Sequence, residues 1–127
     1  MLDHMGIYVR DAKTAFPFYC AVLATLDIRM VQERFEGKAN IFMRDGDRFF
    51  LFLGEGGSEP RNSQPGVSPV HFGFKARSKA EVDTFHATAL AHGGKDNGPP
   101  GHRSPVIYSA FVYDPDGNNI EAIYRLD

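Results

Sequence analysis

The chain has 127 residues, of which 43% are hydrophobic and 24% are charged, a composition typical of one soluble globular domain. A formal net charge of -2 gives no reason to expect a nucleic-acid partner or an anionic membrane surface. No apolar run is long enough to span a bilayer, and polar residues interrupt any signal peptide near the N-terminus. Because Cys20 is the only cysteine, an intrachain disulfide is excluded and we expect a cytoplasmic protein.

Two segments of the chain follow the same plan. Residues 3–10 read DHMGIYVR, and residues 70–77 read VHFGFKAR. Three residue types recur at matching positions: His4 and His71, Gly6 and Gly73, Arg10 and Arg77. A unit that occurs only twice indicates a duplicated supersecondary structure rather than a solenoid, which needs at least three copies.

The first unit is predicted to run strand, helix, then three strands. A strand at 1–9 alternates in polarity, which places His4 and Tyr8 on the face opposite the helix. Asp11 is a suitable N-cap for a helix that reaches about Leu23. The further strands are expected at 28–34, 38–44 and 48–53.

The stretch 54–69 separates the two units. It holds four glycines, three prolines and three serines, so we interpret it as a linker or a mobile flap. The single domain, residues 1–127, is thereby divided into module one at 1–53 and module two at 70–127.

The second unit repeats the order of the first. A strand that begins at Val70 places His71 and Lys75 opposite the helix. Ser78 and Glu81 form a capping box for a helix to about His92.

The rest of the second unit contains a glycine- and proline-rich segment, 96–104, and strands at 105–113 and 119–125 around a strong turn at 114–118. His86 and His92 lie on the helix and are expected at the surface. The two units together predict an α+β fold of two βαβββ modules.

Two histidines and one carboxylate form a candidate metal site. His4 and His71 occupy matching positions in equivalent strands, and Glu121 lies in the last strand, which pairs near the second histidine. A 2-His-1-carboxylate set holds iron, manganese, zinc or a similar divalent ion and leaves positions open for water or substrate. The lack of a thiolate ligand disfavours a structural zinc site.

The repeat, the two histidines and the run DPDGNNIE at 114–121 resemble the vicinal oxygen chelate superfamily, which contains glyoxalase I, bleomycin and fosfomycin resistance proteins and extradiol dioxygenases. The resemblance covers essentially the whole chain. It implies modules whose sheets curl into a shared cup with the metal, Fe, Mn, Zn or Ni, on its floor. It also implies a homodimer, in which the modules pair within one chain or are exchanged between chains.

One departure from glyoxalase I stands out. That enzyme carries a fourth protein ligand in the last strand of the first module, where this chain is expected to place Phe50 or Leu51. Three remaining ligands resemble the extradiol dioxygenases and several resistance proteins. Dioxygenases of this group bring a further histidine and tyrosine near the metal, and His102 and Tyr108 are the candidates for these catalytic roles.

Four residues are candidates for contacts with a small-molecule substrate. Tyr8 and Lys75 share the faces of His4 and His71, Phe49 offers an aromatic wall, and Arg103 lies in the glycine-rich segment. The favoured function is a metal-dependent lyase, isomerase or dioxygenase that chelates two adjacent oxygens of its substrate. The alternative is a binding or resistance protein that sequesters a ligand in the same cup without turnover.

Overall fold

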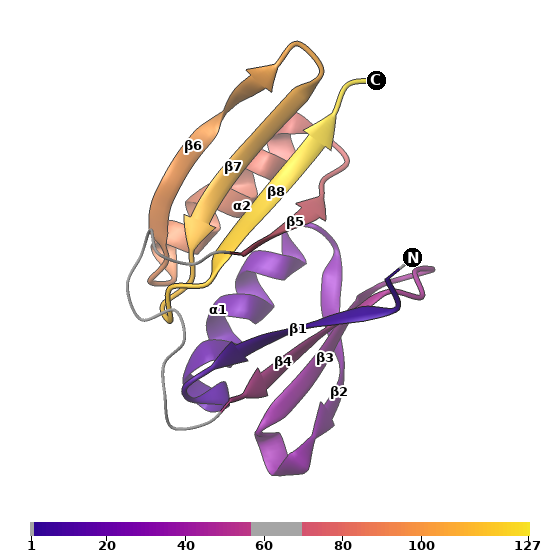
Figure 1. Ribbon diagram of the computed structural model, residues 1–127, viewed down its shortest axis with the longest axis vertical. Coiled ribbons are helices and arrows are strands. Elements are labelled where there is room, and N and C mark those ends of the chain that lie inside the picture. The colour runs from indigo at the N-terminus through magenta and orange to yellow at the C-terminus, as the bar shows by residue number, and fades with distance from the viewer. Residues whose placement is uncertain (1, 57–69) are drawn as a thin grey trace.

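The computed structural model describes residues 2–56 and 70–127, which form two units with the same order of elements (Figure 1). The first unit contains β1 (His4–Val9), α1 (Ala12–Ala24), β2 (Ile28–Arg34), a short turn η1 (Phe35–Gly37), β3 (Ala39–Arg44) and β4 (Phe50–Glu55). The second contains β5 (His71–Lys75), α2 (Lys79–Ala91), β6 (Lys95–Ser104), β7 (Ile107–Tyr113) and β8 (Asn119–Arg125). The predicted α+β fold of two βαβββ modules is confirmed.

Each module forms its own four-stranded mixed sheet. The strand orders are β1-β4-β3-β2 and β5-β8-β7-β6, and the first strand of each module pairs in parallel with the last. The other neighbouring strands are antiparallel. Within the described residues no strand pairs across the two sheets, so β1 and β5, which carry the predicted histidines, are both edge strands.

The helices begin at the predicted caps. The Asp11 side chain accepts a hydrogen bond from the Lys13 amide, and the Ser78 side chain accepts one from the Glu81 amide. The two helices contact each other and pack on their sheets, so that β7 and β8 pass in front of α2 in Figure 1. One core runs through both modules; its fully buried members include Tyr19, Phe42, Leu51, Phe85 and Ile120.

Two expectations about strand limits were wrong. The glycine- and proline-rich segment 96–104 belongs to β6, which pairs with β7 through three register shifts. Because β6 is an edge strand, Pro99 and Pro100 can lack an N–H without breaking the ladder. The strand β4 ends at Glu55, past the expected boundary at 53, and most of the expected linker, residues 57–69, lies outside the described residues.

The turn at 114–118 ties the second module to the first. The Tyr19 hydroxyl of α1 donates a hydrogen bond to the buried Asp114 carboxylate. The Asn118 side-chain amide donates a hydrogen bond to the Tyr8 backbone carbonyl (3.1 Å), and the Arg10 backbone amide donates one to the Asp116 side chain (3.1 Å). Burial raises the pKa of Asp114, and burial beside Asp114 raises the pKa of Tyr19 well above its usual value.

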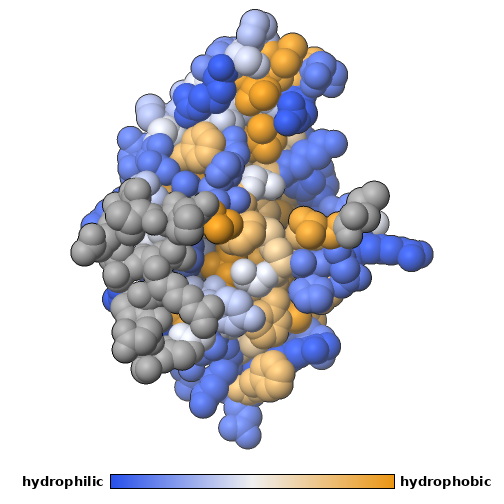
Figure 2. Space-filling view, in the orientation of Figure 1, coloured by the Kyte–Doolittle hydropathy of each residue, from blue (hydrophilic) through white to orange (hydrophobic). Residues whose placement is uncertain are grey.

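Apolar side chains form a band over the side of the molecule seen in Figure 2, between hydrophilic margins. Large hydrophobic residues that are exposed include Leu2, Tyr8, Val31, Phe35 and Val70. In the part of the chain that the structure describes, no helix is long and apolar enough to cross a membrane.

Candidate metal and substrate site

The open face of the second sheet carries His71 beside Glu121. Strand β5 pairs in parallel with β8 so that Gly73 is the partner of Glu121. Because His71 and Gly73 lie on the same face of β5, the Glu121 carboxylate lies next to His71. The His71 Nε2 and Glu121 Oε2 atoms are 3.5 Å apart. Gly73 leaves room for this contact, because a Cβ at that position would lie 3.2 Å from the same carboxylate oxygen.

The His71–Glu121 pair fits a shared metal ion. A zinc-like ion binds nitrogen and carboxylate oxygen at roughly 2.0–2.2 Å, so two such ligands at a tetrahedral angle lie about 3.4 Å apart. The observed separation of 3.5 Å is close to that value. Glu121 is only 7% exposed, and a buried carboxylate needs a compensating charge or donor. A metal ion held by this pair would supply that charge.

His4 occupies the matching position on the first sheet. Its ring stacks on Phe50 of β4 with centroids 4.7 Å apart and an angle of 7° between the planes. Its Nδ1 lies 2.7 Å from the Asp3 carboxylate. A carboxylate at one ring nitrogen fixes the tautomer and orients the other nitrogen as a metal ligand, so Nε2 of His4 is the atom prepared for binding.

The three predicted ligands do not meet within one chain. Among the described residues no group of three or more histidine, cysteine, aspartate or glutamate side chains could hold one metal ion. His71 and Glu121 are brought together, whereas His4 lies on the other sheet. The chain therefore offers two separate parts of a site, one at the edge strand β1 and the other at the edge strand β5 and its neighbour β8.

The position of the missing fourth ligand is Phe52. Strand β1 pairs with β4 so that Gly6 is the partner of Phe52, just as Gly73 is the partner of Glu121. The expectation that Phe50 or Leu51 takes this position was wrong: Phe50 lies beside His4, and Leu51 is 2% exposed in the core. Phe52 has no metal-binding atom, so the first module holds one of the predicted ligands where the second holds two.

The chain also matches the model of a known protein family. The model of the glyoxalase/bleomycin resistance protein/dioxygenase superfamily matches residues 1–122. The chain belongs to this superfamily. Members of this superfamily generally use divalent metals and bind small molecules.

Individual known proteins are moderately similar to this chain. A solved glyoxalase/bleomycin resistance protein from Albidiferax ferrireducens is 30% identical, with a TM-score of 0.80 over 98% of both chains. A lactoylglutathione lyase from Agrobacterium tumefaciens is 27% identical, with a TM-score of 0.66 over 98% of this chain and 92% of that one. An uncharacterized protein of Pseudomonas aeruginosa is 29% identical over 97% of this chain and 87% of its own length.

The two candidates for catalytic roles lie on the helix side of the second sheet. His102 and Tyr108 are cross-strand partners, and their rings are 5.3 Å apart. Tyr108 donates a hydrogen bond to Asp83 of α2 (2.7 Å), and His102 Nε2 lies 3.1 Å from Lys79 Nζ of the same helix. The structure brings these two residues together, but on the face opposite His71 and Glu121. Phe111 of β7 is the cross-strand partner of Glu121 and shares its face, whereas Tyr108, three residues earlier on β7, points to the other face.

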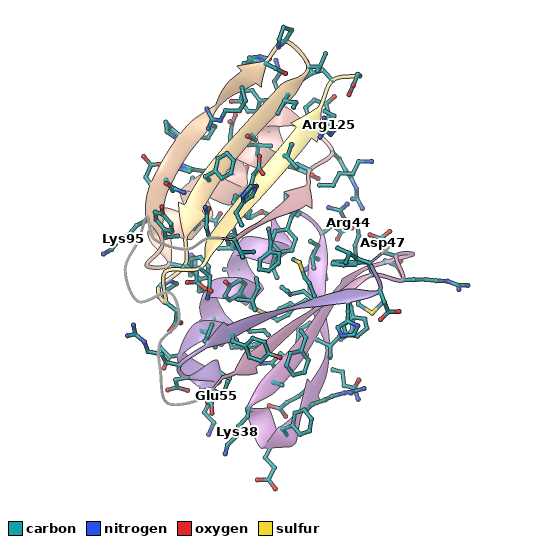
Figure 3. The ribbon with its side chains drawn as sticks, in the orientation of Figure 1. Lys38, Arg44, Asp47, Glu55, Lys95 and Arg125 are labelled. Carbon is teal, nitrogen blue, oxygen red and sulfur yellow. The ribbon has the colours of Figure 1, made fainter. Side chains whose placement is uncertain are left out.

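Two of the substrate candidates line one cavity between the modules. Phe49 and Lys75 contribute to a cavity of about 220 Å³ that Gly73 also lines. Arg44 bounds it and joins the modules through a hydrogen bond to the Lys75 carbonyl (2.6 Å). Figure 3 shows Arg44 next to Asp47, another residue of the cavity wall.

The other two substrate candidates lie on the open faces. Tyr8 contacts Phe52 of β4, with ring centroids 6.2 Å apart. Arg103 lies over the ring of Phe111, with 5.8 Å from its guanidinium carbon to the centroid. Phe111 also contacts His71 edge to face at 5.5 Å.

Sequence reasoning missed Phe111 and misplaced one histidine. The alternation along the predicted strand 105–113 places Phe111 on the same face as Ser109, opposite Val112, so the sequence contained this signal. His86 was expected at the surface but is only 9% exposed, and its Nε2 lies 2.9 Å from Asp96. The neighbouring strand β6, which the sequence did not predict, is what covers it.

Proposed function

We propose that this protein is a divalent-metal-dependent enzyme that acts on a small substrate with two adjacent oxygen atoms. The metal, iron, manganese, zinc or nickel, would be held by His71 and Glu121 of one chain and His4 of a second chain in a homodimer. The lone, partly buried Cys20 is compatible with a cytoplasmic enzyme. The observation that carries the proposal is the 3.5 Å contact between His71 and a buried Glu121 on an open sheet face.

A second chain is part of the proposal because the two histidines lie on edge strands of different sheets. In one chain β1 and β5 each have an unpaired edge, and each carries one of the two matching histidines. An isologous dimer places the same two surfaces in contact twice, so it would complete two identical sites. The exposed apolar residues around β1 supply area that such an interface would bury.

The residues of the chain have distinct roles in this site. Asp3 and Phe50 hold the His4 ring in one orientation, and Gly73 keeps the Glu121 carboxylate free of steric contact. A bound metal ion supplies Lewis-acid stabilisation of the negative charge that develops on the substrate oxygens. Phe52 lines the place of a fourth ligand without binding, which leaves coordination positions for substrate.

The presence of three proposed protein ligands, with Phe52 in the place of a fourth, narrows the range of reactions that the site would catalyse. Phe52 supports a dioxygenase, or a lyase or isomerase with an open metal site, over the lactoylglutathione lyase reaction named for the Agrobacterium relative. The alternative, sequestration of a ligand without turnover, uses the same open faces. Metal-dependent turnover of a catechol or a 2-hydroxy ketone would favour the enzyme over a protein that only sequesters its ligand.

Metal content tests the proposal directly. We expect about one metal ion per chain by elemental mass spectrometry of tag-free protein, and near-complete loss in His71→Ala and Glu121→Ala. The matched control is His92→Ala, which removes an exposed histidine whose ring bonds only the Thr88 carbonyl of its own helix. Stoichiometric metal that persists in both ligand variants would contradict the assignment.

A further inference from the structure

An arginine lies over an aromatic ring on the open face of the second sheet, near the proposed metal ligands. The register of β6 shifts between His102 and Ser104, so Arg103 sits in an irregularity of the edge strand. Such bulges re-aim a side chain and occur often beside active sites. The Arg103 side chain turns onto the face of Phe111, where its guanidinium lies over the ring at 5.8 Å.

Glycines keep the space for this side chain. A Cβ at Gly98 would lie 3.2 Å from Arg103 Nη2 and 3.4 Å from Phe111, and one at Gly101 would lie 3.4 Å from Nη1. Gly98 is also the cross-strand partner of Phe111. A larger side chain at Gly98 would therefore press on both the guanidinium and the ring beneath it.

The guanidinium is oriented but not neutralised. Arg103 Nη2 donates to the Pro99 carbonyl (2.7 Å), which fixes the plane of the group. Of the ion pairs found in residues 2–56 and 70–127, none involves Arg103. The charge of Arg103 contributes to the lowered pKa of Asp96. The Asp96 carboxylate, however, already accepts hydrogen bonds from His86 and from the Gly98 amide, and these two contacts are the main causes of the lowered pKa.

Phe111 connects this cation to the proposed metal ligands. Its ring contacts His71 at 5.5 Å and Arg103 at 5.8 Å, and Glu121 is its cross-strand partner on β8. A planar molecule packed beside this ring would thus meet a cation on one side and the His71–Glu121 pair on the other. Guanidinium groups bind carboxylates in a planar, two-bond geometry.

We propose that Arg103 and Phe111 form an anion subsite that selects a planar substrate bearing a carboxylate. The carboxylate pairs with Arg103, the flat part of the molecule packs beside Phe111, and the two adjacent oxygens reach His71 and Glu121. The substrate class is therefore a small aromatic or conjugated acid. The role of the subsite as a substrate anchor rests on the proposed function, whereas its capacity to bind a planar carboxylate does not.

Benzoate titrated into metal-free, chelator-treated protein and followed by two-dimensional NMR tests this subsite. We expect saturable shifts at the Phe111 and His71 amides and at Arg103 Nε. In Arg103→Gln the affinity should fall roughly tenfold or more, the effect of losing one charged hydrogen-bonding partner. Arg103→Lys, which keeps the charge without the planar group, should bind benzoate more weakly than the native protein.

Arg125→Gln is the matched control, because Arg125 lies on the same face of the sheet, four residues along β8 from Glu121 (Figure 3). It should bind benzoate like the native protein. Two further probes separate the parts of the subsite: benzyl alcohol, planar but neutral, and inorganic phosphate, charged but not planar. Both should bind more weakly than benzoate.

Each contrary result overturns a stated part of the proposal. Unchanged benzoate affinity in Arg103→Gln, or an equal loss in Arg125→Gln, would remove Arg103 from the subsite. Phosphate that binds as tightly as benzoate would remove the requirement for a planar acid. Because the titration uses metal-free protein, a failure of the metal assignment would leave the benzoate result intact, and the two failures can be told apart.

Discussion

Phe52 stands where the pairing of the strands places the proposed ligand Glu121 in the other module. The partner of Gly73 is Glu121, and the partner of the equivalent Gly6 is Phe52. Its ring contacts Tyr8 instead of a metal. The same fold thus carries a ligand in one module and an aromatic wall in the other, a difference of one side chain.

Phe52→Glu should restore the fourth ligand. A carboxylate at this register would add an oxygen donor and a negative charge, so metal affinity should rise roughly tenfold or more. Competition with a chromophoric chelator measures the change. Phe52→Leu is the control and should bind metal like the native protein; a glutamate variant no tighter than the leucine variant would show that Phe52 does not face the metal.

The sequence supplied the proposed ligands but not the residues around them. His4, His71 and Glu121 could be placed on open faces because their strands alternate regularly. His102 could not, because the bulges of β6 leave no alternation to follow. Contacts such as Phe50 on His4 depend on the pairing of β1 with β4, which no local pattern reveals.

At the scale of elements, the helices were predictable and one strand was not. Ser78 and Asp11 carry capping signals that act within a few residues, so the helix starts followed from the sequence. Strand β6 contains Gly98, Pro99, Pro100 and Gly101, residues that disfavour a strand locally. It forms because long-range pairing with β7 outweighs local preference at an edge.

Ser78→Ala should lower the free energy of unfolding by about 1 kcal/mol, because the Glu81 amide at the start of α2 loses its side-chain acceptor. Urea denaturation followed by circular dichroism measures the loss. Ser78→Asp retains an acceptor and should stay close to the native value. Equal stability of the alanine variant and the native protein would show that the cap contributes nothing.

At the scale of the whole molecule, the turn 114–118 links the modules through a buried carboxyl group. Burial raises the pKa of Asp114 above its ordinary value of 3.8, and hydrogen bonds from Tyr19 and Asn118 oppose that rise. The folded state therefore binds this proton more tightly than the unfolded chain does. The ionised carboxylate weakens the fold at neutral pH, and this penalty disappears as the pH falls toward 3.8.

Tyr19→Phe should destabilise the protein by about 2 kcal/mol at pH 7, because the buried Asp114 carboxylate loses a donor. The pKa of Asp114 should rise further, so the loss should shrink as the pH is lowered and the carboxyl group is protonated. Urea denaturation across this pH range measures both effects. Tyr124→Phe, on β8, is the control, and a loss in Tyr19→Phe that does not vary with pH would contradict the account.

We propose that one metal site is assembled from two copies of the chain. Equal amounts of His4→Ala and His71→Ala protein, neither expected to retain metal, can be unfolded together, refolded and analysed for metal. Half of the dimers should then be mixed, and each mixed dimer should have one intact site, so the sample should recover about one metal ion per four chains. No recovery in refolded, dimeric protein would contradict a shared site.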